Sequence, residues 1–193
     1  MKVQLKNVRL TFPALFEPKS IKGSAPKFSA AFLFGKDHPA KAVLLTAIVT
    51  VAKEKWADKA DEVLKSLKAG DKMCVHDGDA KSEYEGYAGN LFVNASSDTR
   101  PMVIDEAKTP LTVADGKPYS GCYVNGVVDV WAQSNEFGKR VNARLLGVQF
   151  VADGPRLAGG ASASADDFEA IETISGAEGV GIGQPASGAA SLF

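Results

Sequence analysis

The chain has 193 residues, of which 45% are hydrophobic and 23% charged, so it has enough apolar content for one packed domain plus additional sequence. It contains no run of about 18 apolar residues, which excludes a membrane-spanning helix. The first residues alternate and carry charge instead of forming the apolar centre of a signal peptide, and we therefore expect a cytoplasmic protein.

The charge is distributed unevenly along the chain. From Asp153 onward, one basic residue stands against six acidic ones, a net charge of −5. The preceding residues hold 21 Lys or Arg and 17 Asp or Glu, a net charge of +4. This asymmetry favours a polyanionic partner for the body, and a tail that competes for the same surface.

Two strands are predicted before the first helix. The apolar residues of segment 3–12 alternate, but the phase slips near Lys6 and Asn7, which predicts a long strand with a β-bulge and with Phe12 in the core. A loop rich in proline, glycine and lysine follows. Residues 27–34, KFSAAFLF, are almost wholly apolar and predict a buried strand.

Helical periodicity begins after Asp37, which we expect to be the N-cap, with Pro39 in the first turn. The pattern predicts one long helix or two, broken near Asp58 and ended by Gly70. The apolar residues expected to pack on the sheet are Val43, Leu44, Ala47, Ile48 and Val51. His38 fits a capping or surface role at the helix start.

The remainder of the body predicts strands again. A short strand, KMCVHD, and a long polar loop precede strands at 90–96 and 101–105, and the two longest strands span 120–132 and 139–151. Several strands with one helical insertion predict a mainly β fold, and our first choice is an OB-fold-like β-barrel. We place this domain at residues 1–153, and a disordered acidic tail rich in Gly, Ala and Ser at 154–193.

The sequence contains no recognisable catalytic motif. The segment HDGD, which begins at His76, offers a metal site in principle, but its spacing matches neither an EF-hand nor a His-rich site, and a turn after a strand explains it better. Cys74 and Cys122 lie in apolar runs and are expected to be buried, reduced thiols. We therefore expect no enzyme activity, no cofactor and no metal.

The two longest strands carry a different kind of surface. One face of 120–132 is apolar, and the opposite face carries Tyr123 and Trp131. In the next strand, Arg140, Asn142 and Arg144 alternate with inward-facing apolar residues. If the strands pair as a hairpin, aromatic rings and cations share one outward face. Such a face suits a nucleic-acid strand, because rings stack on any base and cations neutralise phosphates.

Other residues are expected to extend this face. Phe92 and Asn94 share one side of the strand at 90–96 and join the face if that strand is a neighbour. Further candidate contacts are Lys27, Lys139, Arg100, Tyr84 and Tyr87. The alternative stays open, since exposed aromatic and basic pairs also stabilise sheets by cross-strand packing.

Four segments carry a family resemblance: KVQLKNVRLTFPALFEPK, NLFVNASSDTRP, YSGCYVNGVVDVWAQ and RVNARLLGVQFVADG. They resemble a tailed-phage family of OB-fold single-stranded-DNA-binding proteins, long described as a domain of unknown function. The resemblance covers residues 1 to about 154. It implies sequence-tolerant binding of single-stranded DNA in phage replication or recombination, no catalytic activity, and a location in the host cytoplasm.

The tail is similar to the acidic ends of phage and bacterial single-strand binders, which often finish in phenylalanine. This similarity implies contacts with replication proteins through Asp166, Asp167, Phe168, Glu169 and Phe193. The final residues SLF lack adjacent acids, and this departs from the pattern. Two alternatives stay open: a homodimer, and a phage structural or assembly β-barrel that uses the aromatic face for protein–protein contacts.

Overall fold

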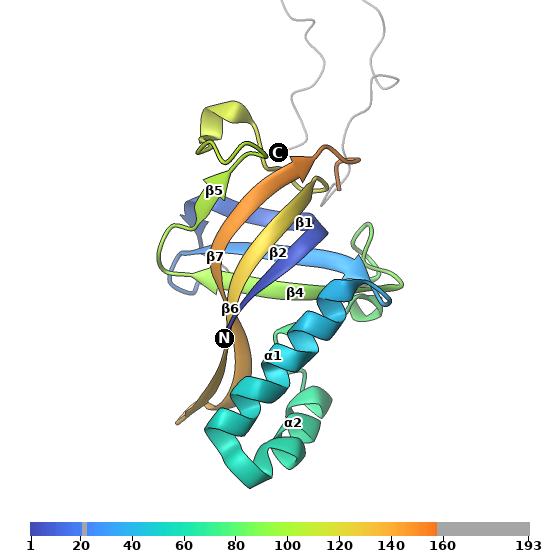
Figure 1. The fold of residues 1–193 in the computed structure, drawn as a ribbon, viewed down its shortest axis with the longest axis vertical. Coiled ribbons are helices and arrows are strands. Elements are labelled where there is room, and N and C mark those ends of the chain that lie inside the picture. The colour runs from blue at the N-terminus through green and yellow to red at the C-terminus, as the bar shows by residue number, and fades with distance from the viewer. Residues whose placement is uncertain (21–22, 158–193) are drawn as a thin grey trace, which may run out of the picture. The chain divides into compact units, whose positions relative to one another are not determined.

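Five strands form a closed barrel in this computed structural model, which describes residues 1–20 and 23–157 (Figure 1). They are β1 (Lys2–Lys19), β2 (Lys27–Gly35), β4 (Asn90–Ser97), β6 (Tyr123–Asn135) and β7 (Gly138–Ala152). The sheet runs in the order β4-β2-β1-β6-β7, and a parallel bridge between Ser96 and Arg144 closes it. A five-stranded Greek-key barrel is the OB-fold architecture, so the predicted fold class is confirmed.

Two short strands extend the barrel at its margins. β3 (Val75–Asp77) pairs with β4, and β5 (Met102–Ile104) pairs in parallel with β7. Three 3-10 turns lie in the connections: η1 (Ala57–Lys59), η2 (Gly78–Lys81) and η3 (Val113–Asp115).

β1 contains the predicted bulge and a second irregularity. Its register against β6 shifts between Leu5 and Val8, and Asn7 there has a φ of 50°. A second shift, against β2, begins after Thr11 and turns Phe12 outward with a φ of 48°. The prediction that Phe12 belongs to the core is therefore wrong: a second bulge reverses the alternation, and the ring is 48% exposed.

The helical insertion consists of α1 (Pro39–Trp56) and α2 (Ala60–Ala69), separated by η1 near Asp58 as expected. The N-cap is His38, not Asp37, because the His38 Nδ1 accepts a 3.2 Å hydrogen bond from the amide of Ala40. Leu44, Ala47, Ile48 and Val51 pack on the core, but Val43 lies on the exposed side. Within the described segments, neither helix is long and apolar enough to span a bilayer.

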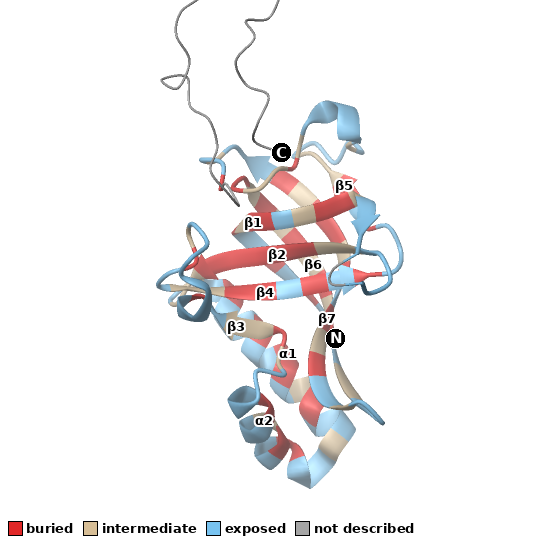
Figure 2. Ribbon diagram, turned by 180° about the vertical axis from the view of Figure 1, so that it is seen from behind, coloured by how far each residue is buried: buried red, intermediate tan, exposed pale blue. Residues whose placement is uncertain are grey.

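The helices and the β6–β7 hairpin extend beyond the barrel on the same side (Figure 1). Figure 2 shows buried residues along the barrel strands, and an exposed surface at the hairpin tip. Inside the barrel, a Cβ on Gly126 would lie 2.6 Å from the ring of Phe32, so glycine makes room for this buried phenylalanine.

The body continues past the predicted boundary at residue 153. The Tyr119 hydroxyl donates a 2.9 Å hydrogen bond to Asp153, and the Arg9 guanidinium donates to the carbonyl of Pro155 at 2.7 Å. Leu157 is buried in a small cluster with Leu33 and Phe92. Gly154–Leu157 therefore pack on the barrel instead of belonging to the tail. The predicted tail beyond them lies outside the described residues.

Candidate nucleic-acid interface

The outward face of the β6–β7 hairpin gathers four of the predicted residues. Trp131 is the register partner of Asn142, and Gln133 is the partner of Arg140. Directly opposed residues of an antiparallel pair project to the same face. The alternating residues Val130, Val141 and Ala143 are buried in the core, so Trp131, Arg140, Asn142 and Arg144 point away from it. The Trp131 side chain is 37% exposed.

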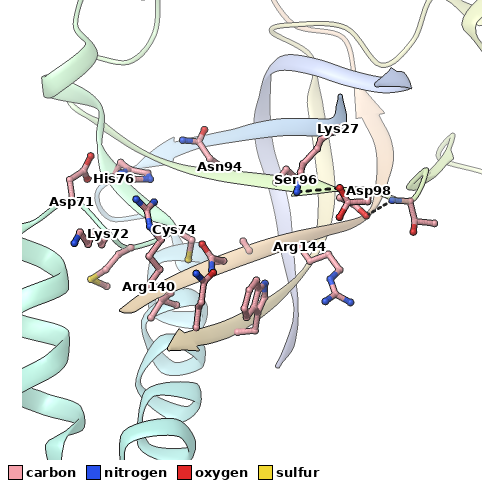
Figure 3. Close-up of a pocket in the computed structure, with 18 residues that line it drawn as sticks. Lys27, Asp71, Lys72, Cys74, His76, Asn94, Ser96, Asp98, Arg140 and Arg144 are labelled. Carbon is pink, nitrogen blue, oxygen red and sulfur yellow. Dashed lines mark hydrogen bonds and ion pairs between the residues drawn. The ribbon is translucent and has the colours of Figure 1, made fainter. Parts of the chain in front are cut away.

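This face forms one wall of a cavity of about 830 Å³. Figure 3 shows Asn94 and Ser96 from β4 on one side of it, and Arg140 and Arg144 from β7 on the other. Lys27, at the start of β2, lies at one end, and the segment before β3 lies at the other. The full lining from these segments is Lys27, Asp71–Cys74, His76, Asn94, Ser96–Thr99, Trp131, Gln133 and Arg140–Arg144.

The cavity occupies the usual ligand-binding region of an OB fold. Such folds bind oligonucleotides on the face of their second and third barrel strands, between the loops that join strands 1–2 and 4–5. Here those strands are β2 and β4, and the β6–β7 hairpin supplies the loop between the fourth and fifth. Lys27 follows directly on the loop between the first two strands.

Positive charge dominates the cavity lining. Of its two acidic residues, Asp98 lies 3.2 Å from the Lys27 ammonium, and Asp71 lies 2.6 Å from the His76 Nδ1. Asp129, the register partner of Arg144, instead pairs with the N-terminal amino group at 2.9 Å. Among the described residues, Lys72, Arg140 and Arg144 take part in no ion pair. These three cations are therefore available to an anionic ligand.

Hydrogen bonds position the hairpin side chains. The Asn142 amide donates to the Gln133 Oε1 at 3.0 Å, and the Gln133 amide donates to the Asn135 Oδ1 at 3.0 Å. This chain of amides runs beside Trp131 toward the hairpin turn. Gln133 lies two residues from Trp131 on the same face, so the alternation that identified Trp131 also points to it.

Two aromatic residues of the predicted site are not available for stacking. Phe92 is 1% exposed, although it lies on the predicted side of β4, because His76 stacks on it at 5.0 Å and Tyr87 covers it at 5.0 Å. Tyr87 is 2% exposed, and its hydroxyl bonds that of Thr11 at 2.8 Å. Burial raises the pKa of Tyr87. Placing these two rings in the binding face was wrong: the loop after β3 folds back over the sheet.

The other predicted contacts lie away from the cavity. Tyr84 packs edge-on against Phe12, with 5.3 Å between ring centroids. The Arg9 guanidinium lies 5.7 Å from the ring of Tyr123, at the opposite end of β6 from Trp131. Arg100 lies over the ring of Phe16 at 5.6 Å. Lys139 lines a neighbouring groove. Asp166, Asp167, Phe168, Glu169 and Phe193 lie outside the described residues.

The cavity also contains residues that the sequence did not predict as DNA contacts. Lys72, Cys74 and His76 come from the segment between α2 and β4, and Ser96 is on β4. Ser96 continues the face of Asn94 and follows from alternation. Lys72 and His76 reach the cavity through tertiary packing, because no periodicity connects their segment to the distant hairpin.

The HDGD segment spans the end of β3 and the start of the turn η2. The Asp77 Oδ1 accepts from the Asp79 amide at 3.1 Å, and the Lys36 ammonium lies 2.8 Å from Asp79. The hydrogen bond from Lys36 holds the pKa of the Asp79 carboxyl below its usual value. His76, Asp77 and Asp79 are thus engaged with protein partners.

Both cysteines are buried and free of disulfide bonds, as expected. Burial raises the pKa of the Cys74 thiol to about 12. It also raises the pKa of Cys122. Both side chains are therefore neutral thiols near pH 7.

Comparison with known proteins places the chain in a family. A family model described as "Enterobacter phage Enc34, ssDNA-binding protein" matches residues 1–178. Putative protein p50 of Acyrthosiphon pisum secondary endosymbiont phage 1 is 46% identical over 173 residues, which cover 88% of this chain and 93% of that protein.

Solved structures agree with this placement. The single-stranded DNA-binding protein from bacteriophage Enc34 in complex with ssDNA superimposes with a TM-score of 0.61 and 27% identity, over 80% of this chain and 88% of that one. The single-stranded DNA binding protein gp2.5 of bacteriophage T7 is similar in fold, with a TM-score of 0.54 and 13% identity over 92% of this chain and 99% of that one. The chain belongs to the family of the ssDNA-binding protein of Enterobacter phage Enc34.

Proposed function

We propose that this protein binds single-stranded DNA with little sequence preference, and that it protects the strand during phage DNA replication or recombination in the host cytoplasm. The observation that carries the proposal is the cationic cavity on the OB-fold binding face, with the exposed ring of Trp131 in its wall. Family membership supports the same ligand.

The binding mode follows from the lining. Trp131 offers a flat surface to one base, and stacking of this kind tolerates any base because every base has a π-face. Arg140, Arg144 and Lys72 pair with phosphates and release counterions. The amides of Asn94 and Asn142 donate to phosphate, sugar or base edges. These contacts bind and cover the strand, and none of them requires a chemical step.

Titration with deoxythymidine oligomers of graded length, at several salt concentrations, tests the proposal. We expect affinity to rise with length to a plateau and to fall with salt, with a slope of about 0.7 per phosphate neutralised. A structural or assembly protein that uses this face for protein contacts predicts no salt-dependent affinity for the oligomers. That result would exclude DNA binding.

The acidic tail has a regulatory part in this proposal. The tail carries a net negative charge, and it therefore competes with DNA for the cavity. It recruits replication proteins through the segment that includes Asp166, Asp167, Phe168 and Glu169. Because Leu157 packs in a buried cluster of the body, the informative truncation ends at that residue. We expect it to tighten DNA binding at low salt, and an unchanged affinity would argue against competition.

A further inference from the structure

A second groove of about 580 Å³ lies between α2 and the start of β7. Ser66 and Leu67 of α2 lie on one side of this groove, and Lys139 of β7 lies on the other. The complete lining is Lys59, Glu62, Val63, Ser66, Leu67, Gly70, Lys72 and Lys139. It combines three ammonium groups and one hydroxyl with one carboxylate, so its net charge is positive.

The second groove adjoins the first cavity. Lys72 lines both of them. Lys139 and Arg140 are consecutive residues of β7, so they project to opposite faces of the hairpin and line the second groove and the first cavity respectively. The two sites therefore lie on opposite faces of β7 and meet at Lys72.

The electrostatics of the second groove favour an anionic ligand. In the part of the chain that the structure describes, Lys59, Lys72 and Lys139 form no ion pair. Clustered unpaired cations repel one another, and a polyanion relieves this repulsion while releasing its counterions. Val63 and Leu67 form the buried floor of the groove, so its accessible surface is mainly polar and charged.

We infer that single-stranded DNA continues from the first cavity past Lys72 into the second groove, where Lys59 and Lys139 bind its phosphates. This inference rests on the proposed function, and it adds a backbone-binding segment to that site. The turn η1, which contains Lys59, then has a binding role besides connecting α1 and α2. The residues that line the second groove include no aromatic ring. The groove therefore binds phosphates and does not stack bases.

The test compares deoxythymidine oligomers of about 6 and about 16 nucleotides, within the range of lengths that OB folds bind. The variant is Lys59→Gln/Lys139→Gln, which leaves every residue of the first cavity unchanged. The control is Lys6→Gln/Lys41→Gln, which removes the same charge from two exposed lysines that line neither site. Circular dichroism and thermal unfolding check that both variants fold.

We expect the Lys59/Lys139 variant to bind the long oligomer on the order of tenfold more weakly near 0.1 M salt, with a salt slope smaller by about 1.4. Its affinity for the short oligomer should match the wild type, and the Lys6/Lys41 control should match the wild type for both. If the Lys59/Lys139 variant binds both oligomers equally more weakly, or binds neither more weakly, the inference that DNA enters the second groove is overturned. Failure of the wild type to bind any oligomer instead overturns the proposed function.

Discussion

The main-chain carbonyl of Lys72 accepts a 3.1 Å hydrogen bond from the amide of Val141, which joins the segment after α2 to the β6–β7 hairpin. This bond places Lys72 beside the cations of β7, as Figure 3 shows for Arg140. The DNA site is therefore assembled from segments far apart in sequence. Four predictions test how its parts and its supporting core behave.

Trp131 should be the main stacking residue. Trp131→Ala should weaken binding of deoxythymidine oligomers by roughly 5- to 150-fold, the equivalent of about 1–3 kcal/mol for one stacked base. Trp131→Phe should retain most of the affinity, because it keeps a ring. Since the chain has two tryptophans, a Trp56→Phe background makes Trp131 the sole reporter. Its fluorescence should be quenched on binding, and an unchanged signal would contradict stacking.

Arg140 and Arg144 should neutralise phosphates. The Arg140→Ala/Arg144→Ala variant should bind more weakly, with a salt slope smaller by about 1.4, because each phosphate contact contributes about 0.7. Isothermal titration or fluorescence anisotropy at four or more salt concentrations measures the slope. An unchanged slope would remove both residues from the site. The Lys6→Gln/Lys41→Gln protein controls for the loss of two positive charges elsewhere.

Phe92 should act in stability, whereas Asn94, two residues along the same strand, should act in binding. Phe92→Ala removes a buried ring and should lower the free energy of unfolding by about 3–5 kcal/mol. Asn94→Ala alters an exposed residue of the cavity and should weaken DNA binding with little change in unfolding. Urea denaturation and DNA titration of both variants distinguish the two roles, and the reverse pattern would contradict the structure.

The buried Cys74 thiol should make stability fall at alkaline pH. Its folded-state pKa of about 12 lies above the unfolded value of about 9. Its stabilising contribution is therefore complete below pH 9 and is lost progressively up to pH 12. Near pH 10.5, the loss is roughly 2 kcal/mol.

Denaturation of wild type and Cys74→Ala across this pH range isolates the effect from that of other titrating groups. The difference in free energy of unfolding between the two proteins should change by roughly 2 kcal/mol between pH 9 and pH 10.5, because only the wild type loses the contribution of the thiol. Parallel curves would show that the thiol ionises equally in both states.

Much of the fold follows from local patterns. The alternation in residues 120–132 and 139–151 predicts the hairpin, and its inward valines make Trp131, Arg140 and Arg144 face outward. The phase slip near Asn7 predicts the first bulge. These features are encoded by neighbours along the chain, where burial of one strand face sets the direction of each side chain.

The burial of other residues could not be predicted from local patterns. Alternation places Phe92 on the outer face of β4 correctly, yet it contains no information about what covers the ring: His76 of β3, and Tyr87 of the loop that follows β3. Phe12 likewise leaves the core because of a second bulge, at a position where the surrounding sequence shows no phase slip.

The sequence by itself determined the barrel strands, the outward face of the hairpin and the charge asymmetry, because these depend on periodicity and composition. Only the tertiary structure decided that Lys72 and His76 line the cavity, that Phe92 and Tyr87 are buried, and that Gly154–Leu157 belong to the body. The physical reason is that packing between distant segments determines which faces remain open to a ligand, and no local pattern records that packing.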